Sequence, residues 1–119
     1  MTNQQRAALA LANKKRSRAA TFKKELRAMT MDEGLYVVAD LVESGDDWLD
    51  HLRVRQVVGA VRYCGPWHVD QVCKAGGVNR DARLRELPAG RRLHLAVTIR
   101  YEAKRYAAYK AKAPARLAA

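Results

Sequence analysis

The sequence predicts a single all-α domain in which a long N-terminal helix packs on a small helical body and an extended basic C-terminal helix follows. Its 119 residues are the length of one domain. Proline is absent before Pro66, which leaves room for several helices. Sustained apolar/polar alternation and Asn-Gly or Asp-Gly hairpin turns, the usual signs of strands, do not occur. The expected parts of this domain, residues 1–119, are 1–29, 30–50, 51–96 and 97–119.

The first helix is expected from about Gln4 to Met29, because its apolar residues recur at helical spacing. Basic side chains fill its other faces. In its first half the apolar stripe is mostly alanine, so this half is expected to fray or to fold only on a partner. The apolar positions are Ala8, Leu11, Ala12, Ala19, Phe22, Leu26 and Met29.

Residues 30–50 predict an acidic helix followed by a turn. Thr30-Met-Asp-Glu33 matches a capping box, in which the threonine and glutamate side chains each bond a free backbone N–H. The helix should end near Gly45. Asp46–Leu49 is then a turn that carries a core-seeking Trp48.

Residues 51–96 predict a series of shorter helices. Val54, Val57, Val58 and Val61 have the spacing of an amphipathic helix. Pro66 is suited to the first position of the next helix, which Gly76-Gly77 closes.

Two further helices complete the expected fold. Asn79 or Asp81 could cap a short one that ends at Leu87, and residues 88–90 form a turn. The last helix is expected from about Arg91 to Lys112, where Pro114 ends it.

Charge is the most prominent feature of the composition, with 23 Lys+Arg, 12 Asp+Glu and a net charge of +11. Residues 1–30 carry 8 basic and 1 acidic side chains, 31–50 carry 0 and 7, 51–90 carry 7 and 3, and 91–119 carry 8 and 1. The sums of +7, −7, +4 and +7 place two basic ends around an acidic segment. This pattern predicts a polyanionic partner, with the acidic segment facing away from it.

Several other functions are not expected. No apolar run is long enough to span a membrane, and the basic N-terminus lacks the apolar core of a secretory signal, so the expected location is the cytoplasm. The spacing of Cys64, His68 and Cys73 is not that of a structural zinc site. The two cysteines are better explained as small buried core residues, and His68 as a residue of the turn. No catalytic constellation is apparent, so we do not expect the protein to be an enzyme or to bind a small-molecule substrate. We also expect no metal, no cofactor and no association with a membrane.

The order and spacing of several segments resemble the actinobacterial integration host factor, a family built on a helix-two-turn-helix module. The match covers about residues 7–96, and it leaves open whether the chain is a cellular member or a phage-encoded relative of that family. The segments that carry it are Ala-Leu-x-x-Ala at Ala8–Ala12, Leu52-Arg-Val54, Gly65, Ala75-Gly-Gly-Val78 and Arg83-Leu-Arg85-Glu-Leu87.

The resemblance implies a nucleoid-associated, monomeric protein that binds double-stranded DNA with little sequence preference. It also implies DNA bending or compaction, and assistance to a site-specific recombinase on the same DNA. The family uses a glycine turn on phosphate and arginines in the minor groove. Here Tyr63 and Pro66 replace a glycine and a basic residue of the family pattern. The candidate contacts, including those of the two basic helices, are Gly65, Trp67, His68, Arg62, Arg80, Arg83, Arg85, Lys14, Lys15, Arg16, Arg18, Arg100, Lys104 and Arg105.

Two alternatives stay open. The same module occurs in a ribosomal protein, so structured RNA is a second candidate ligand, and an acidic host protein captured by a basic phage protein is a third. Tyr101, Tyr106 and Tyr109 could stack on bases, but packing on the body and on the N-terminal helix is the favoured interpretation.

Overall fold

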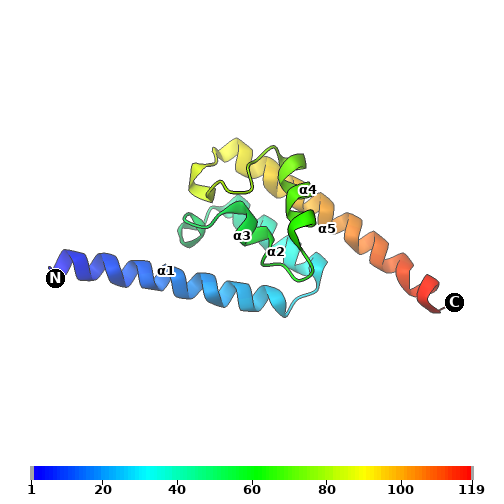
Figure 1. The fold of residues 1–119 in the computed structure, drawn as a ribbon, viewed down its shortest axis with the longest axis horizontal. Coiled ribbons are helices and arrows are strands. Elements are labelled where there is room, and N and C mark those ends of the chain that lie inside the picture. Colours follow the sequence, from blue (N-terminus) through cyan, green and yellow to red (C-terminus); the bar gives the residue numbers. More distant parts are fainter. Residues whose placement is uncertain (1, 119) are drawn as a thin grey trace.

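The computed structural model describes the backbone of residues 2–118 and the side chains of residues 2–111. Within these residues the chain is all-helical, with one isolated β-bridge, as the sequence predicts (Figure 1). Two long helices extend from a small body, and the two ends of the chain lie far apart. The elements are α1 (Asn3–Arg27), α2 (Met31–Ser44), η1 (Asp47–Leu49), α3 (Val54–Val58), α4 (Pro66–Gly76), η2 (Leu84–Glu86) and α5 (Ala89–Ala118).

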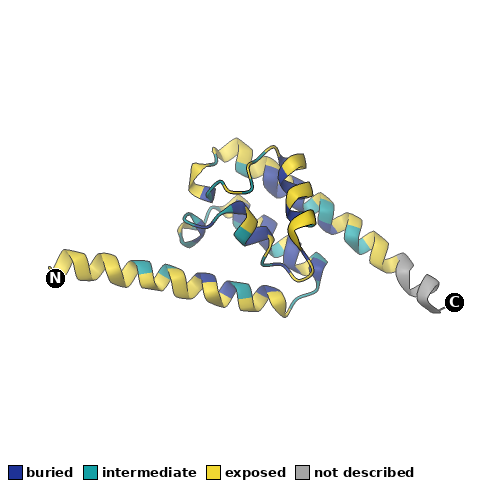
Figure 2. Ribbon diagram, in the orientation of Figure 1, coloured by how far each residue is buried: buried dark blue, intermediate teal, exposed yellow. Residues whose placement is uncertain are grey.

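Helix α1 is anchored to the body only through its second half. Ala19, Phe22 and Leu26 are its buried residues. Earlier in α1 almost every side chain is exposed (Figure 2). Its start is fixed by a capping box between Thr2 and Gln5, which the sequence interpretation missed.

The core lies between α2 and α5, the two helices with the most extensive mutual contact. Leu35 and Val38 from α2 are fully buried, as are Leu95 and Ile99 from α5. Helices α3 and α4 add their valines to the same cluster. Burial of this apolar surface is the main stabilising contribution of a body this small.

The ends of α2 agree with expectation except for one half of the capping box. The Thr30 hydroxyl accepts a bond from the Glu33 N–H at 3.5 Å and donates one to Asp32 at 2.7 Å. Among the described contacts, the Thr30 backbone N–H has no return bond to the Glu33 carboxylate, so the cap is one-sided. At the other end Gly45 adopts the left-handed conformation with φ of 73°.

The prediction of a short helix that ends at Leu87 is wrong. Residues 79–83 form an extended turn, and only the single 3₁₀ turn η2 follows it. The reason is an antiparallel bridge between Arg53 and Arg83, which uses backbone groups that a helix would need. Asn79 instead caps a local turn by accepting from the Asp81 N–H at 2.8 Å.

Both expected ends of the last helix also need correction. Residues 88–90 do not form a separate turn, because the Arg92 N–H already donates to the Pro88 carbonyl at 2.9 Å and α5 begins at Ala89. The bounds of α5 also extend beyond Pro114. A proline removes one helical hydrogen bond and bends a helix, but the helix can continue past it.

Candidate nucleic-acid interface

Three adjoining hollows run along one side of α1. The first and second share Lys15 and Asp47, and the second and third share Arg16 and His51. We call this continuous depression the α1 groove. Its charged and aromatic lining consists of Lys14, Lys15, Arg16, Arg18, Lys23, Asp47, Trp48, Asp50, His51, Arg53, Arg83 and Arg85.

Backbone pairing places Arg83 and Arg85 in the groove. The Leu84 N–H donates to the Leu52 carbonyl at 3.0 Å, and the Arg85 N–H donates to the Asp50 carbonyl at 3.1 Å. The side chains of Leu52 and Leu84 are buried in the core. Arg83, at the β-bridge, and Arg85, in the 3₁₀ turn η2, flank Leu84 in the chain and line the groove instead of the core.

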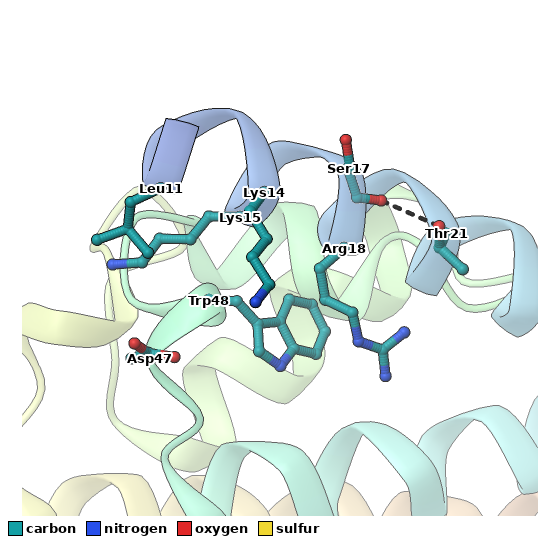
Figure 3. Close-up of a pocket in the computed structure, with 8 residues that line it drawn as sticks. All are labelled: Leu11, Lys14, Lys15, Ser17, Arg18, Thr21, Asp47 and Trp48. Carbon is teal, nitrogen blue, oxygen red and sulfur yellow. Dashed lines mark hydrogen bonds between the residues drawn. The ribbon is translucent and has the colours of Figure 1, made fainter. Parts of the chain in front are cut away.

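Trp48 closes the first hollow against α1. Its ring lies edge to face with Phe22 at 5.1 Å, and the Arg18 guanidinium lies 4.9 Å from the indole centroid. The indole N–H donates to Asp46 at 3.3 Å. Figure 3 shows the indole facing α1, with Lys14 and Arg18 on that side. The tryptophan therefore fixes the position of α1 relative to η1.

The groove is strongly electropositive, with eight Lys or Arg side chains and two carboxylates in its lining. Among the side chains of residues 2–111, only Arg18 of those eight pairs with a carboxylate, that of Glu25 at 3.7 Å. The Asp50 carboxylate is already 3.6 Å from Arg92. Most of the positive charge is therefore available to an incoming anion.

Lys14, Lys15, Arg16, Arg18, Arg83 and Arg85 are six of the expected contacts, and the structure brings them together in this groove. Sequence reasoning missed Lys23, His51 and Arg53. The β-bridge that brings residues 53 and 83 together joins segments 30 residues apart. A pairing between segments so far apart cannot be predicted from a local sequence pattern.

Trp67, His68 and Arg105 line a different hollow, between α4 and α5, which shares no residue with the α1 groove. Gly65 stands at the start of α4 as its N-cap. Tyr101 and Tyr109, which also line this hollow, are 62% and 64% exposed, so the favoured packing interpretation is wrong for both. Tyr106 is partly buried and packs against the core.

Other expected contacts are engaged in ion pairs within the protein. Arg80 contacts Asp70 at 2.9 Å, and Arg105 contacts Glu102 at 3.1 Å. Arg100 is held by Asp40 and Glu43 of α2, which raise the pKa of its guanidinium. The acidic segment thus binds part of the basic C-terminal helix. Lys104 is exposed on α5 and lines neither hollow.

The turn before α4 contains a strained residue. Tyr63 has φ of 67°, the left-handed conformation that favours glycine, and it stands where the family pattern has glycine. Its ring is 69% exposed and lies under the Arg62 guanidinium at 4.9 Å from the centroid. Tyr63 thus adopts a backbone conformation that glycine would adopt at lower cost.

Cys64 and Cys73 are buried free thiols. Burial raises the pKa of Cys64 to about 11 and also raises that of Cys73, so both are protonated at neutral pH. Among the described residues, no group of three or more His, Cys, Asp or Glu side chains is placed to hold a metal ion.

Comparisons with protein-family models, curated proteins and solved structures found no match. The resemblance to integration host factor therefore stays a prediction. Across the described part of the chain, no helix combines the length and the apolar content needed to cross a membrane.

Proposed function

We propose that this protein binds double-stranded DNA through the α1 groove. The observation that carries the proposal is the convergence of basic side chains from three separate segments, residues 14–23, 51–53 and 83–85. Clustering of positive charge on one face is the electrostatic signature of a surface that binds phosphate backbones.

The shape of α1 also favours a duplex. A helix of 25 residues is about 38 Å long, at roughly 1.5 Å per residue, which is close to one turn of duplex DNA. Residues 1–24 contain seven basic and no acidic side chains. A helix of this length can therefore reach phosphates on both sides of a DNA groove, and its first 24 residues bring no unfavourable carboxylate contact.

Within the groove, the arginines have the most specific role. Their planar guanidinium groups form forked bonds to phosphate and enter narrow minor grooves. Arg83 and Arg85 are held on a paired backbone segment rather than on a free helix end. Their guanidinium groups are therefore held in position before the DNA binds, while the lysines of α1 add non-specific attraction to the phosphates.

The test is a fluorescence-anisotropy titration with a 20-base-pair duplex. Replacing both Arg83 and Arg85 by alanine should weaken binding about fivefold or more for each arginine, at about 1–3 kcal/mol per contact. The matched control is Lys74→Ala with Arg91→Ala, which removes the same charge from exposed positions outside the groove. Equal losses in the two double variants would contradict a defined site.

Structured RNA is tested in the same experiment. A competing RNA duplex presents a deep, narrow major groove and a different backbone spacing. Stronger competition by RNA than by DNA would replace the DNA proposal with an RNA-binding function. Bending of the DNA and assistance to recombination are implied by the family resemblance and remain predictions, and end-to-end energy transfer on a labelled duplex tests the first.

A further inference from the structure

His51 occupies the point at which two hollows of the α1 groove meet. The residues on both sides of it are fixed, since the carbonyls of Asp50 and Leu52 accept backbone bonds from Arg85 and Leu84. The imidazole is half-buried. The backbone on both sides of His51 is thus held in place, and the half-buried ring lies where the two hollows join.

Charged groups from three directions face this ring. Helix α1 contributes Lys15, Arg16 and Lys23, the segment after His51 contributes Arg53, and the bridged segment contributes Arg83 and Arg85. The carboxylates on the same walls are Asp47 and Asp50, and the second of these already contacts Arg92. Cations therefore dominate the surroundings of the imidazole.

These surroundings disfavour the imidazolium in the free protein. Burial, followed by the charges of Lys15, Arg16 and Arg83, lowers the pKa of His51 below 6.5, and Asp50 opposes this shift. The ring is consequently neutral at pH 7 in the free protein. A neutral ring can contribute one N–H to a phosphate but no charge.

A phosphate backbone in the groove reverses this balance, because its charges neutralise the surrounding cations and attract a cation at position 51. We infer that duplex binding takes up a proton at His51, and that the resulting imidazolium is a phosphate ligand of the α1 groove. This inference rests on the proposed function and adds a pH-dependent regulation of the same site.

The sign of the effect follows from linkage. The bound complex holds the proton up to a higher pH than the free protein, so affinity rises as the pH falls through the interval between the two pKa values. Above that interval the ring is neutral in both states, and below it the ring is charged in both. Each unit between the two pKa values gives at most a tenfold change in Kd.

Among side chains, histidine is the one whose ordinary pKa lies within this range. The two other histidines lie elsewhere. His68 lines the hollow between α4 and α5, and His94 lies 3.4 Å from the Ala75 carbonyl.

The experiment measures the Kd of the full chain for a 20-base-pair duplex at pH 6, 7 and 8 at constant ionic strength. The wild type should bind several-fold to tenfold more tightly at pH 6 than at pH 8. His51→Gln, which keeps a polar side chain of similar size, should lose most of this dependence, whereas His68→Gln should keep it. His51→Lys should bind tightly at every pH. An unchanged pH dependence in His51→Gln overturns the inference.

Titration of the His51 ring by NMR gives an independent measurement. Its pKa should lie below 6.5 in the free chain and rise when the duplex is added. Tight binding with no such rise overturns the proton uptake and leaves the proposed function intact. Absence of duplex binding at all three pH values overturns both.

Discussion

At the scale of single residues, Tyr63 provides the sharpest test of the turn that leads into α4. A non-glycine residue in the left-handed conformation costs about 1–2 kcal/mol. Its ring is mostly exposed, so removing the ring sacrifices little buried surface. We therefore expect Tyr63→Gly to be more stable than Tyr63→Ala by about 1 kcal/mol, although glycine is usually the less stabilising of the two.

Urea unfolding of both variants measures this difference. The alanine variant is the control, because it removes the ring and keeps the strained backbone. If alanine proved the more stable replacement, the left-handed backbone at this position would be refuted. The test is separate from DNA binding, so it examines the turn geometry alone.

Residue identity alone predicted the groove only in part. Arg83 and Arg85 were nominated as DNA contacts by the family resemblance, and both side chains line the α1 groove. Arg80 and Arg100 have the same chemistry but are bound to carboxylates 10 and 57–60 residues away in the chain. An arginine is available to DNA only if no carboxylate lies beside it in the folded chain. The order of charges along the sequence does not reveal those neighbours.

At the scale of elements, α5 is apolar on two opposite sides over its first turns. Leu95 is fully buried against α4, with its Cδ1 atom 3.1 Å from the place where a Cβ on Gly76 would stand. Leu93, two residues earlier, is 49% exposed. The two leucines thus share one helix and one residue type but differ in burial.

This contrast gives a matched pair of variants. Leu95→Ala should lower the free energy of unfolding by about 2–5 kcal/mol, because it leaves a cavity in the core. Leu93→Ala should change it by no more than about 0.5 kcal/mol, as is usual for a surface position. Denaturant unfolding followed by circular dichroism measures both. Similar losses would mean that the exposed side of α5 is covered in solution.

The elements that the sequence predicted correctly are those with local signals. Thr30 and Gly45 mark the ends of α2, and Pro66 and Gly77 mark those of α4. The segment that ends at Leu87 was wrongly expected to be helical because its course is set by pairing with residues 50–55. Caps and periodicity are local, whereas a bridge between distant segments is not.

At the scale of the whole molecule, the net charge of +11 is distributed in two different ways. The acidic segment takes up part of the charge of α5 through Arg100, and Lys110 lies 3.9 Å from Asp32. The N-terminal charge has few such partners among the described side chains and opens onto the α1 groove. The two basic ends, equal in sequence, are therefore unequal as sites for a polyanion.

This inequality predicts how binding responds to salt. If six to ten phosphates are neutralised, the affinity for duplex should fall about 10³–10⁵-fold between 50 and 200 mM salt, with a slope near −0.9 per phosphate in a plot of log K against log salt concentration. Removing Arg83 and Arg85 together should reduce the magnitude of that slope by about 2. Replacing Arg100 and Arg105 by alanine, two arginines already paired with carboxylates, should leave the slope nearly unchanged.

Anisotropy titrations at four salt concentrations measure the slopes of the wild type and of the two double variants. A larger change for the α5 pair than for the groove pair would move the DNA site from α1 to α5, and a flat response in the wild type would exclude the electrostatic mechanism altogether.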